Sequence, residues 1–419
     1  MTRLEILENN SKRKLSIIEK IHPDKLGCAP STTFLTIHWD NQDGHHNNDD
    51  FLILSKGKPN SHSSFLRNQS FFTKHYEEKH GYAVTDHQFD ENQDYHAGYC
   101  SKNKETKSYH LEESFSFKEY SQWMSIYWEQ IKHKKVRDLV LPGSHDAATY
   151  GIHSSSERSP DYRSPWFAPN AVISKWSKTQ SATIYKQLVF GVRYFDLRVA
   201  PTSSGELKVQ HNMFSVPITE VLDDIAAFIK DKREIIILHW NHFNFLTDQQ
   251  HKQLQSLIKT KLDGKMAPRE LGVDVTVEQL EQTPIINIYD DRFSVVKENT
   301  IPDQIAEESC FWYHHSLRSA YDFDQYHSCK SVINFLEKEL KEEHSTFWVL
   351  QCVLTADNRL SNFYQLAVDS VFDWTMMEMD SFLKLFEKIE KLNIKTNIIM
   401  TDFVTFYPLT RFCINQNLK

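Results

Sequence analysis

The chain has 419 residues, a formal net charge of −8 at pH 7 and 40% hydrophobic residues, a composition that supports a large folded core. Duplex binding needs a basic face, so the acidic balance argues against nucleic acid as a partner. The charged N-terminus lacks the apolar core of a signal peptide, and no apolar run approaches the roughly 18 residues of a membrane span. The scattered cysteines, with no CxxC pair, fit a reducing compartment. We therefore expect no transmembrane segment and a location in the cytoplasm, peripherally on membranes, or outside the cell after export without a classical signal peptide.

The length fits a domain of roughly 250 residues together with a smaller unit. Residues 1–120 alternate strand-like runs, such as Thr33–Ile37 and Phe51–Leu54, with polar stretches such as Asn41–Asp50. This alternation predicts a small β-rich N-terminal domain over residues 1–120. No motif in the segment indicates its role.

Beyond residue 136 the predicted strands and helices alternate along the chain. The predicted strands are Val136–Leu141, Arg193–Val199, Leu207–His211, Glu234–Trp240, Pro284–Tyr289, Phe311–His314, Phe347–Leu354 and Asn397–Asp402. The predicted helices include Ile218–Lys230, Asp248–Leu262, Val332–Glu342 and Met376–Lys391. This order is typical of a parallel sheet covered by helices, and about eight strands favour a closed barrel. An open doubly wound sheet would bring a glycine-rich phosphate-binding turn, and the chain has neither a GxGxxG nor a Walker sequence.

Charged and histidine side chains stand where several apolar runs end. They are His145 and Asp146, Asp196 and Arg198, His211, and Asp402. Strand ends are where barrel enzymes carry their chemistry. Two imidazoles can act as base and acid on a phosphodiester, and a guanidinium can hold the non-bridging phosphate oxygens. The pattern therefore predicts phosphodiester chemistry.

Three separated segments resemble the X-box of phosphatidylinositol-specific phospholipases C. They are Leu141–Asp146, Gly191–Arg198, and the step of 13 residues from Arg198 to His211. Further similarity lies in Trp176–Gln180, Ile235–Phe243 and Val349–Thr355, so the resemblance runs from about residue 136 to about residue 407. It implies an irregular TIM-like barrel over residues 121–419, in a chain of the α/β class with an additional N-terminal β-rich unit.

The resemblance also implies an activity. The expected reaction is cleavage of phosphatidylinositol, or a related inositol lipid at a membrane surface, to diacylglycerol and inositol 1,2-cyclic phosphate. His145 would be the general base, His211 the general acid and Arg198 the phosphate clamp. Asp402 matches a carboxylate that orients the first histidine in the bacterial enzymes, and Asp146 would support His211.

Substrate contacts are expected from residues after neighbouring strands. They are Asp196, which is also expected to pair with Arg198, and then His239, Asn241, Tyr289 and Asp290. Arg193 stands before its strand and is expected at the surface or the barrel bottom. Trp166 and Phe167, in a loop after the first barrel strand, are expected either to contact the membrane or to pack under the loop.

The residue at position 198 bears on the metal requirement. The calcium-dependent branch of the family carries an acidic residue at this place and another where this chain has Trp240. A fixed guanidinium can do the electrostatic work of a divalent ion, so we expect no metal and no cofactor. Asp146 and Asp196 still offer a weak Ca²⁺ site of two carboxylates.

Two alternatives stay open at this point. One is a glycerophosphodiesterase or related phosphodiesterase, which would use a metal held by carboxylates. The other is a catalytically silent lipid- or protein-binding module, whose mark would be the loss of a histidine, whereas His145 and His211 are both present. The sequence assigns neither the phosphorylation state of the lipid head group nor the oligomeric state.

Overall fold

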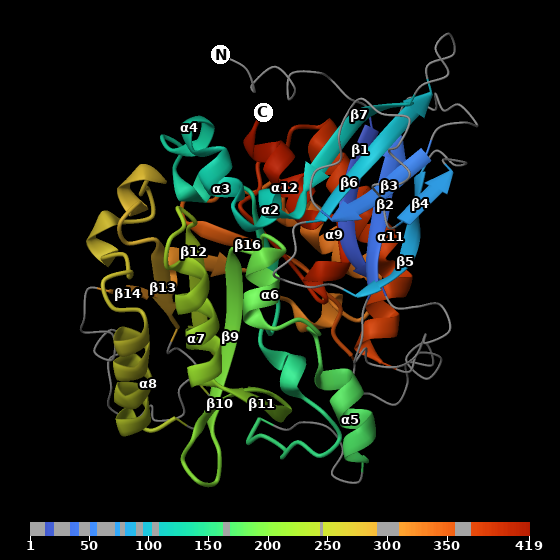
Figure 1. Cartoon of the computed structure of the whole chain (residues 1–419). Coiled ribbons are helices and arrows are strands. Elements are labelled where there is room, and N and C mark those ends of the chain that lie inside the picture. The colour runs from blue at the N-terminus through green and yellow to red at the C-terminus, as the bar shows by residue number, and fades with distance from the viewer. Residues whose placement is uncertain are drawn as a thin grey trace. The chain divides into compact units, whose positions relative to one another are not determined.

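A computed structural model of the chain describes residues 13–20, 34–41, 51–56, 72–75, 80–88, 95–102, 109–161, 168–243, 246–290, 310–356 and 370–419. The chain forms two compact units (Figure 1). One contains residues 1–26 and 30–121, and the other contains residues 27–29 and 122–419.

The first unit is built from antiparallel strands. One sheet has the order β1-β2-β5, with β1 at Arg13–Lys20, β2 at Phe34–Asn41 and β5 at His80–Gln88. The second has the order β4-β3-β6-β7, with β4 at Phe72–His75, β3 at Phe51–Lys56, β6 at Tyr95–Lys102 and β7 at Tyr109–Ser116, and α2 (Phe117–Ser121) follows it. Phe51, Ile53 and Cys100 form a buried cluster between β3 and β6. The predicted β-rich unit is confirmed.

The second unit contains a curled parallel sheet of eight strands in the order β14-β13-β12-β9-β8-β17-β16-β15. Their bounds are β8 Leu141–Ser144, β9 Tyr194–Pro201, β12 Ile236–Asn241, β13 Ile285–Tyr289, β14 Phe311–Tyr313, β15 Leu317–Ser319, β16 Phe347–Cys352 and β17 Ile398–Thr401. The edge strands β14 and β15 are joined by the short 3-10 helix His314–Ser316, so both edges of the sheet meet in one chain segment. The predicted α/β class and irregular barrel are confirmed.

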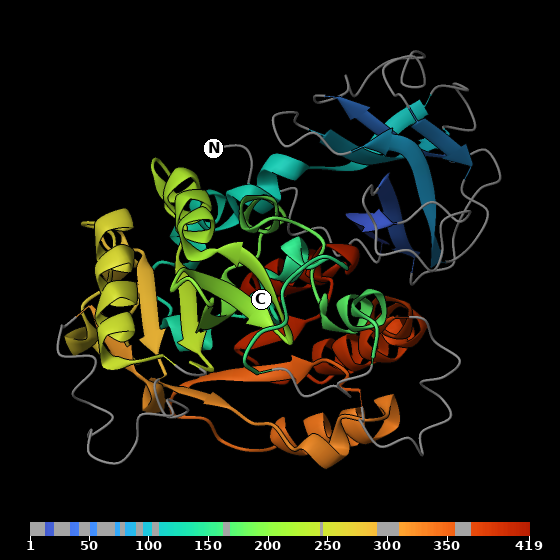
Figure 2. The same cartoon turned by 90° about the horizontal axis from the view of Figure 1, so that it is seen from below.

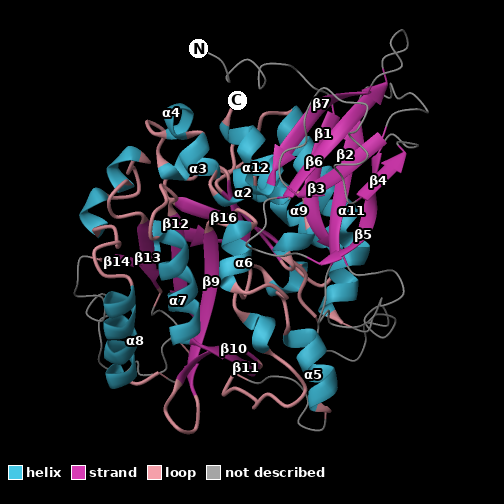
Figure 3. Cartoon of the chain, viewed as in Figure 1, coloured by secondary structure: helices cyan, strands magenta, loops and turns pink. Residues whose placement is uncertain are grey.

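Helices surround this sheet (Figures 2 and 3). Their bounds are α3 Trp123–Ile126, α4 Trp128–Ile131, α5 Asn170–Ser177, α6 Ile184–Val189, α7 Ile218–Ile229, α8 Asp248–Lys261, α9 Cys329–Glu339, α11 Val371–Lys391 and α12 Leu409–Asn417. In α7 the buried residues Ile218, Val221, Leu222 and Ile225 recur at the spacing of one helix face. A capping box of Thr247 and Gln250 begins α8. None of the described helices is both long and apolar enough to span a bilayer.

Two predicted strands differ from the structure. Residues 136–138 form a 3-10 turn, and the strand begins only at Leu141. The reason is that the side chain of Asn397 donates hydrogen bonds to the carbonyls of Val136 (3.1 Å) and Leu139 (2.8 Å), which a sheet ladder would otherwise use. The predicted strand Leu207–His211 exists as β10, but it pairs antiparallel with β9 and with β11 (Met213–Pro217) and stands outside the parallel order.

Candidate active site

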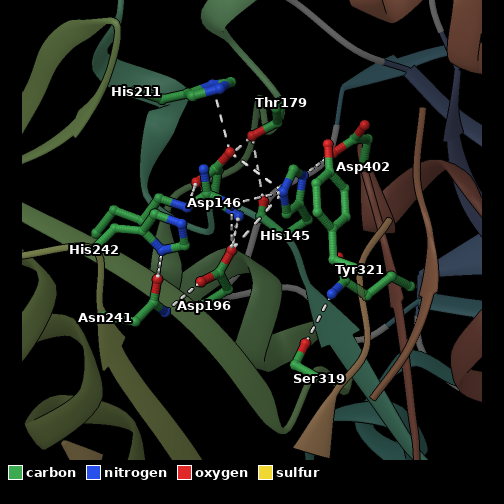
Figure 4. Close-up of polar contacts among 12 residues, drawn as sticks. His145, Asp146, Thr179, Asp196, His211, Asn241, His242, Ser319, Tyr321 and Asp402 are labelled. Carbon is green, nitrogen blue, oxygen red and sulfur yellow. Dashed lines mark hydrogen bonds and ion pairs between the residues drawn. The ribbon is translucent and has the colours of Figure 1, made fainter. Parts of the chain in front are cut away.

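The carboxyl ends of the parallel strands gather a cluster of polar side chains (Figure 4). His145 and Asp146 follow β8, Asp196 and Arg198 lie in β9, and Asp402 follows β17. Gly143 lets β8 lie close to β17, because a Cβ there would stand 2.9 Å from the Ile398 side chain. The β10–β11 hairpin adds His211 at its tip. The structure therefore brings together all the residues that the sequence predicted as catalytic.

His145 is held at both ring nitrogens. Its Nδ1 lies 2.7 Å from Asp402 Oδ1, and its Nε2 lies 3.0 Å from Arg198 Nη2. Because a guanidinium only donates, Nε2 must accept in this arrangement, which leaves the Nδ1 proton to be donated to Asp402. Whenever the imidazole is neutral, the two contacts therefore favour the tautomer that carries its proton on Nδ1.

The carboxylates around His145 favour its protonated form. Burial lowers the pKa of His145, but the charges of Asp146 and Asp402 outweigh burial and raise the pKa to about 9, against an opposing effect of Arg198. For Asp402 the effect of burial has the opposite sign: burial raises the pKa of this carboxyl, against the effect of His145. The proton affinity of His145 therefore depends on how closely its carboxylate neighbours are held.

Asp146 lies between the two imidazoles. Its Oδ2 is 3.4 Å from His145 Nε2 and 3.4 Å from His211 Nδ1, and the ring centroids are 6.5 Å apart. The residue has a left-handed backbone (φ 42°), which its amide supports by donating to Asp196 Oδ2 at 3.1 Å. One carboxylate thus touches both candidate acid–base groups.

A backbone carbonyl orients His211. Ser177 O, at the end of α5, lies 2.8 Å from His211 Nδ1. A carbonyl accepts only, so Nδ1 carries a proton and Nε2 is the position that can exchange a proton with a ligand.

Arg198 is a fixed cation in this cluster. Its Nε lies 2.5 Å from Asp146 Oδ1, and its Nη2 lies 3.4 Å from Asp196 Oδ2. Burial would lower the pKa of Arg198, but Asp146 and Asp196 outweigh it and raise the pKa. Burial would raise the pKa of Asp196, and Arg198 outweighs that effect and lowers it. Asn241 Nδ2 donates to the other oxygen of Asp196 at 2.6 Å, so Asp196 holds Arg198 while Asn241 holds Asp196.

Of the remaining residues predicted to contact substrate or membrane, some lie beside the cluster and others do not. His239 lies in the cluster's wall, with Nδ1 2.8 Å from Tyr194 Oη and Nε2 3.7 Å from Asp290 Oδ2. Tyr289 does not join the cluster, because its hydroxyl bonds His251 Nδ1 of α8 at 2.8 Å. Its side chain therefore lies on the outer side of the sheet. Trp166 and Phe167 lie outside the described residues.

Residues beyond the predicted catalytic set also lie near the cluster. His242, with a left-handed backbone (φ 48°), contacts Asn241 Oδ1, and burial and Arg198 lower its pKa to about 3, so it is neutral at physiological pH. Tyr321, after β15, points toward the cluster (Figure 4). Gln180 lies behind His145 and belongs to the Trp176–Gln180 motif, which was a usable signal. Tyr321 follows a three-residue strand and carried no signal.

The cluster also has a cation-binding geometry. His145, Asp146 and Asp196 each offer a ligand atom, and these atoms lie within 4.8 Å of one another. Arg198 already neutralises both carboxylates at 2.5 and 3.4 Å. A metal ion would therefore have to displace the guanidinium. These residues can hold either the Arg198 guanidinium or a metal ion, but not both together.

The fold and this cluster define an α/β barrel protein with two imidazoles, a guanidinium and carboxylates at its carboxyl-terminal face. The model of the family "Phosphatidylinositol-specific phospholipase C, X domain" matches residues 170–283. The chain is 49% identical to a PI-PLC X domain-containing protein of Dictyostelium discoideum over 340 residues, covering 72% of this chain and 59% of that protein. It is 30% identical over 172 residues to PI-PLC X domain-containing protein 3 of Homo sapiens, covering 38% of this chain and 53% of that protein.

Residues 170–283 of the chain carry a phosphatidylinositol-specific phospholipase C X domain, and the chain is related to X domain-containing proteins. It spans only part of the length of these curated relatives. Among solved structures, it is similar to the phosphatidylinositol-specific phospholipase C of Listeria monocytogenes, with a TM-score of 0.48, 17% identity, and coverage of 72% of this chain and 99% of that one.

Proposed function

We propose that this protein is a phospholipase C that cleaves phosphatidylinositol, or a related inositol lipid, to diacylglycerol and inositol 1,2-cyclic phosphate. The observation that carries the proposal is the pair of imidazoles 6.5 Å apart, bridged by Asp146 and flanked by Arg198. A base and an acid on one carboxylate suit a reaction in which one oxygen loses a proton while another gains one.

Each residue has a distinct part in the proposed reaction. His145 Nε2 takes the proton of the inositol 2-hydroxyl, whose oxygen then bonds to phosphorus. The bond from phosphorus to the glycerol oxygen breaks, and His211 gives that oxygen a proton. Arg198 moves from His145 Nε2 to the non-bridging phosphate oxygens, which frees the base at the moment when the substrate arrives. Asp402 keeps the His145 tautomer and stabilises its protonated form.

The first experiment uses the full chain and phosphatidylinositol vesicles in excess EDTA, with cyclic inositol phosphate followed by phosphorus NMR. We expect cyclic product from the native chain and none from His145→Ala. His344→Ala is the matched control, because His344 lies just before β16, at the opposite end of the barrel. Product from His145→Ala at the native rate would contradict the proposal.

The cation geometry favours one second candidate, a metal-dependent phosphodiesterase of the glycerophosphodiester type. His145, Asp146 and Asp196 would then be metal ligands. The same assay separates the two functions. An enzyme that is inactive in EDTA and regains activity when Ca²⁺ is added would support the second candidate. Turnover of glycerophosphodiesters without cyclic product would support it as well.

A further inference from the structure

The segment Thr179–Gln180 lies behind the site and contacts the strand ends that carry His145 and Asp402. Gln180 is fully buried. Its Nε2 donates to His145 O at 3.1 Å and to Thr401 O at 3.0 Å, and its Oε1 accepts from the Val404 amide at 3.1 Å. One side chain therefore joins the end of β8 to both flanks of Asp402.

The orientation of this amide is determined by its partners. Two partners are carbonyl oxygens, which only accept, and the third is an N–H, which only donates. A flipped amide would place its oxygen against two carbonyls, so Nε2 must face them. Both amide hydrogens and one carbonyl lone pair are used, and an apolar side chain would leave three buried backbone groups without these partners.

Thr179 reinforces the same connection. Its Oγ1 donates to His145 O at 3.2 Å, and its carbonyl accepts from the Phe403 amide at 2.7 Å. Phe403 has a left-handed backbone (φ 47°), a conformation that bulky residues rarely adopt unless neighbouring contacts hold it. The turn that carries Asp402 is therefore held from both sides by residues 179 and 180.

We propose that Gln180 is a positioning residue. It fixes the backbone separation between His145 and Asp402, and so maintains the 2.7 Å contact between His145 Nδ1 and Asp402 Oδ1. The inference rests on the proposed function only in that His145 acts as the base. Gln180 itself touches no reacting atom.

The test compares Gln180→Met with Gln187→Met. Gln187 is also fully buried, and its Nε2 also donates to two carbonyls, Ala147 O and Ala182 O at 2.7 Å each, but no bond of its side chain reaches residues 401–404. Both variants lose a buried amide of the same size. Only Gln180→Met breaks the connection to the Asp402 turn.

The first readout is an imidazole NMR titration of the folded full chain without substrate, with the His145 signal identified by its loss in His145→Gln. We expect the pKa of His145 to fall below its native value of about 9 in Gln180→Met and to keep that value in Gln187→Met, because a looser Asp402 stabilises the imidazolium less. We also expect kcat on phosphatidylinositol to fall about 10- to 100-fold in Gln180→Met, with KM within about threefold of native.

An unchanged His145 titration in Gln180→Met, or an equal shift in both variants, overturns the proposal. If Gln180→Met does not fold, Gln180→Asn makes the same comparison, since the shorter amide cannot reach all three backbone groups. The titration needs no turnover. A chain that shows the expected shift but no lipid cleavage would contradict the proposed function and leave the positioning role intact.

Discussion

Two arginines, one just before β9 and one within it, differ in how their charge is satisfied. Arg193, just before the strand, is fully buried and bonds Glu234 Oε2 through Nε (3.0 Å) and Nη2 (2.6 Å), while Nη1 donates to Leu188 O and Val192 O. Arg198, inside the strand, faces two carboxylates and an imidazole. Its Nε and both carboxylate oxygens of Asp146 make ion pairs but no well-formed hydrogen bond.

The difference separates an ion pair that serves the fold from one that the proposed reaction would use. Glu234 is engaged further by the amides of Met124 and Ser125, so the pair at the amino-terminal end of the barrel has donors and acceptors in balance. At the carboxyl-terminal end, the Arg198–Asp146 pair is held by charge without a completed hydrogen bond at Arg198 Nε or at either Asp146 carboxylate oxygen. Such a cluster can reorganise around an arriving phosphate, whereas the Arg193 pair cannot.

The largest expected effect comes from Arg198→Met. We expect kcat to fall about 10³-fold or more, because the non-bridging phosphate oxygens lose their cation. The free energy of unfolding should fall by less than in the Arg193 variant, since Arg198 Nε makes no completed hydrogen bond and Asp196 keeps the Asn241 donor. Phosphorus NMR and urea unfolding on the same sample measure both quantities. Turnover at the native rate in Arg198→Met would mean that Arg198 does not bind the phosphate, so the two arginines would not differ in function.

Arg193→Met should show the reverse pattern. We expect the free energy of unfolding to fall by about 3 kcal/mol, because Glu234 is left buried and unpaired. Turnover per folded molecule should stay within about threefold of native, since no atom of the phosphate site is touched. The control is Arg193→Met combined with Glu234→Gln, which removes the stranded charge and keeps an acceptor for Ser125 N. Failure of the double variant to recover stability would mean that the charge is not the cause.

Asp402→Asn tests the charge surrounding the base. A base works unprotonated, so kcat/KM rises with pH through the pKa of His145, which stands at about 9. Removing one of the carboxylates that raise this pKa should move the limb of the pH profile to lower pH and lower kcat about 10²-fold. Asp274→Asn, at a surface carboxylate paired with Lys135 and Arg137, should leave the limb in place. If the limb of the pH profile shifts equally in both variants, the limb does not report the pKa of His145.

The strand ends of this site were predictable because parallel strands are continuous apolar runs. A polar residue that ends such a run is visible in the sequence, which is how His145, Arg198 and Asp402 were found. The same continuity hides which side each strand residue faces. All five residues of β13 are buried, so no alternation shows that Tyr289 points toward α8.

Contacts between segments far apart in the chain could not be predicted from the sequence either. Asn397, which keeps Val136–Leu139 out of the sheet, and Gln180, which reaches Val404, each act across more than 200 residues. No periodic pattern marks either residue, because each is a single side chain that hydrogen-bonds backbone groups far away in the sequence. A motif can draw attention to such a residue, but its backbone partners become visible only in the fold.

The smallest expected effect concerns membrane contact at the carboxyl-terminal end of the barrel. Phe323, after β15, has an exposed fraction of 45%, while Leu392, at the end of α11 on the opposite side of the barrel, has one of 62%. If the site works at a lipid surface, Phe323→Ser should lower turnover of phosphatidylinositol vesicles by about three- to tenfold, because an interfacial apolar side chain contributes about 1 kcal/mol. Turnover of a monomeric short-chain substrate should stay native in Phe323→Ser, and Leu392→Ser should alter neither. Equal loss on both substrates would place Phe323 in the structure of the barrel and not at its membrane-facing surface.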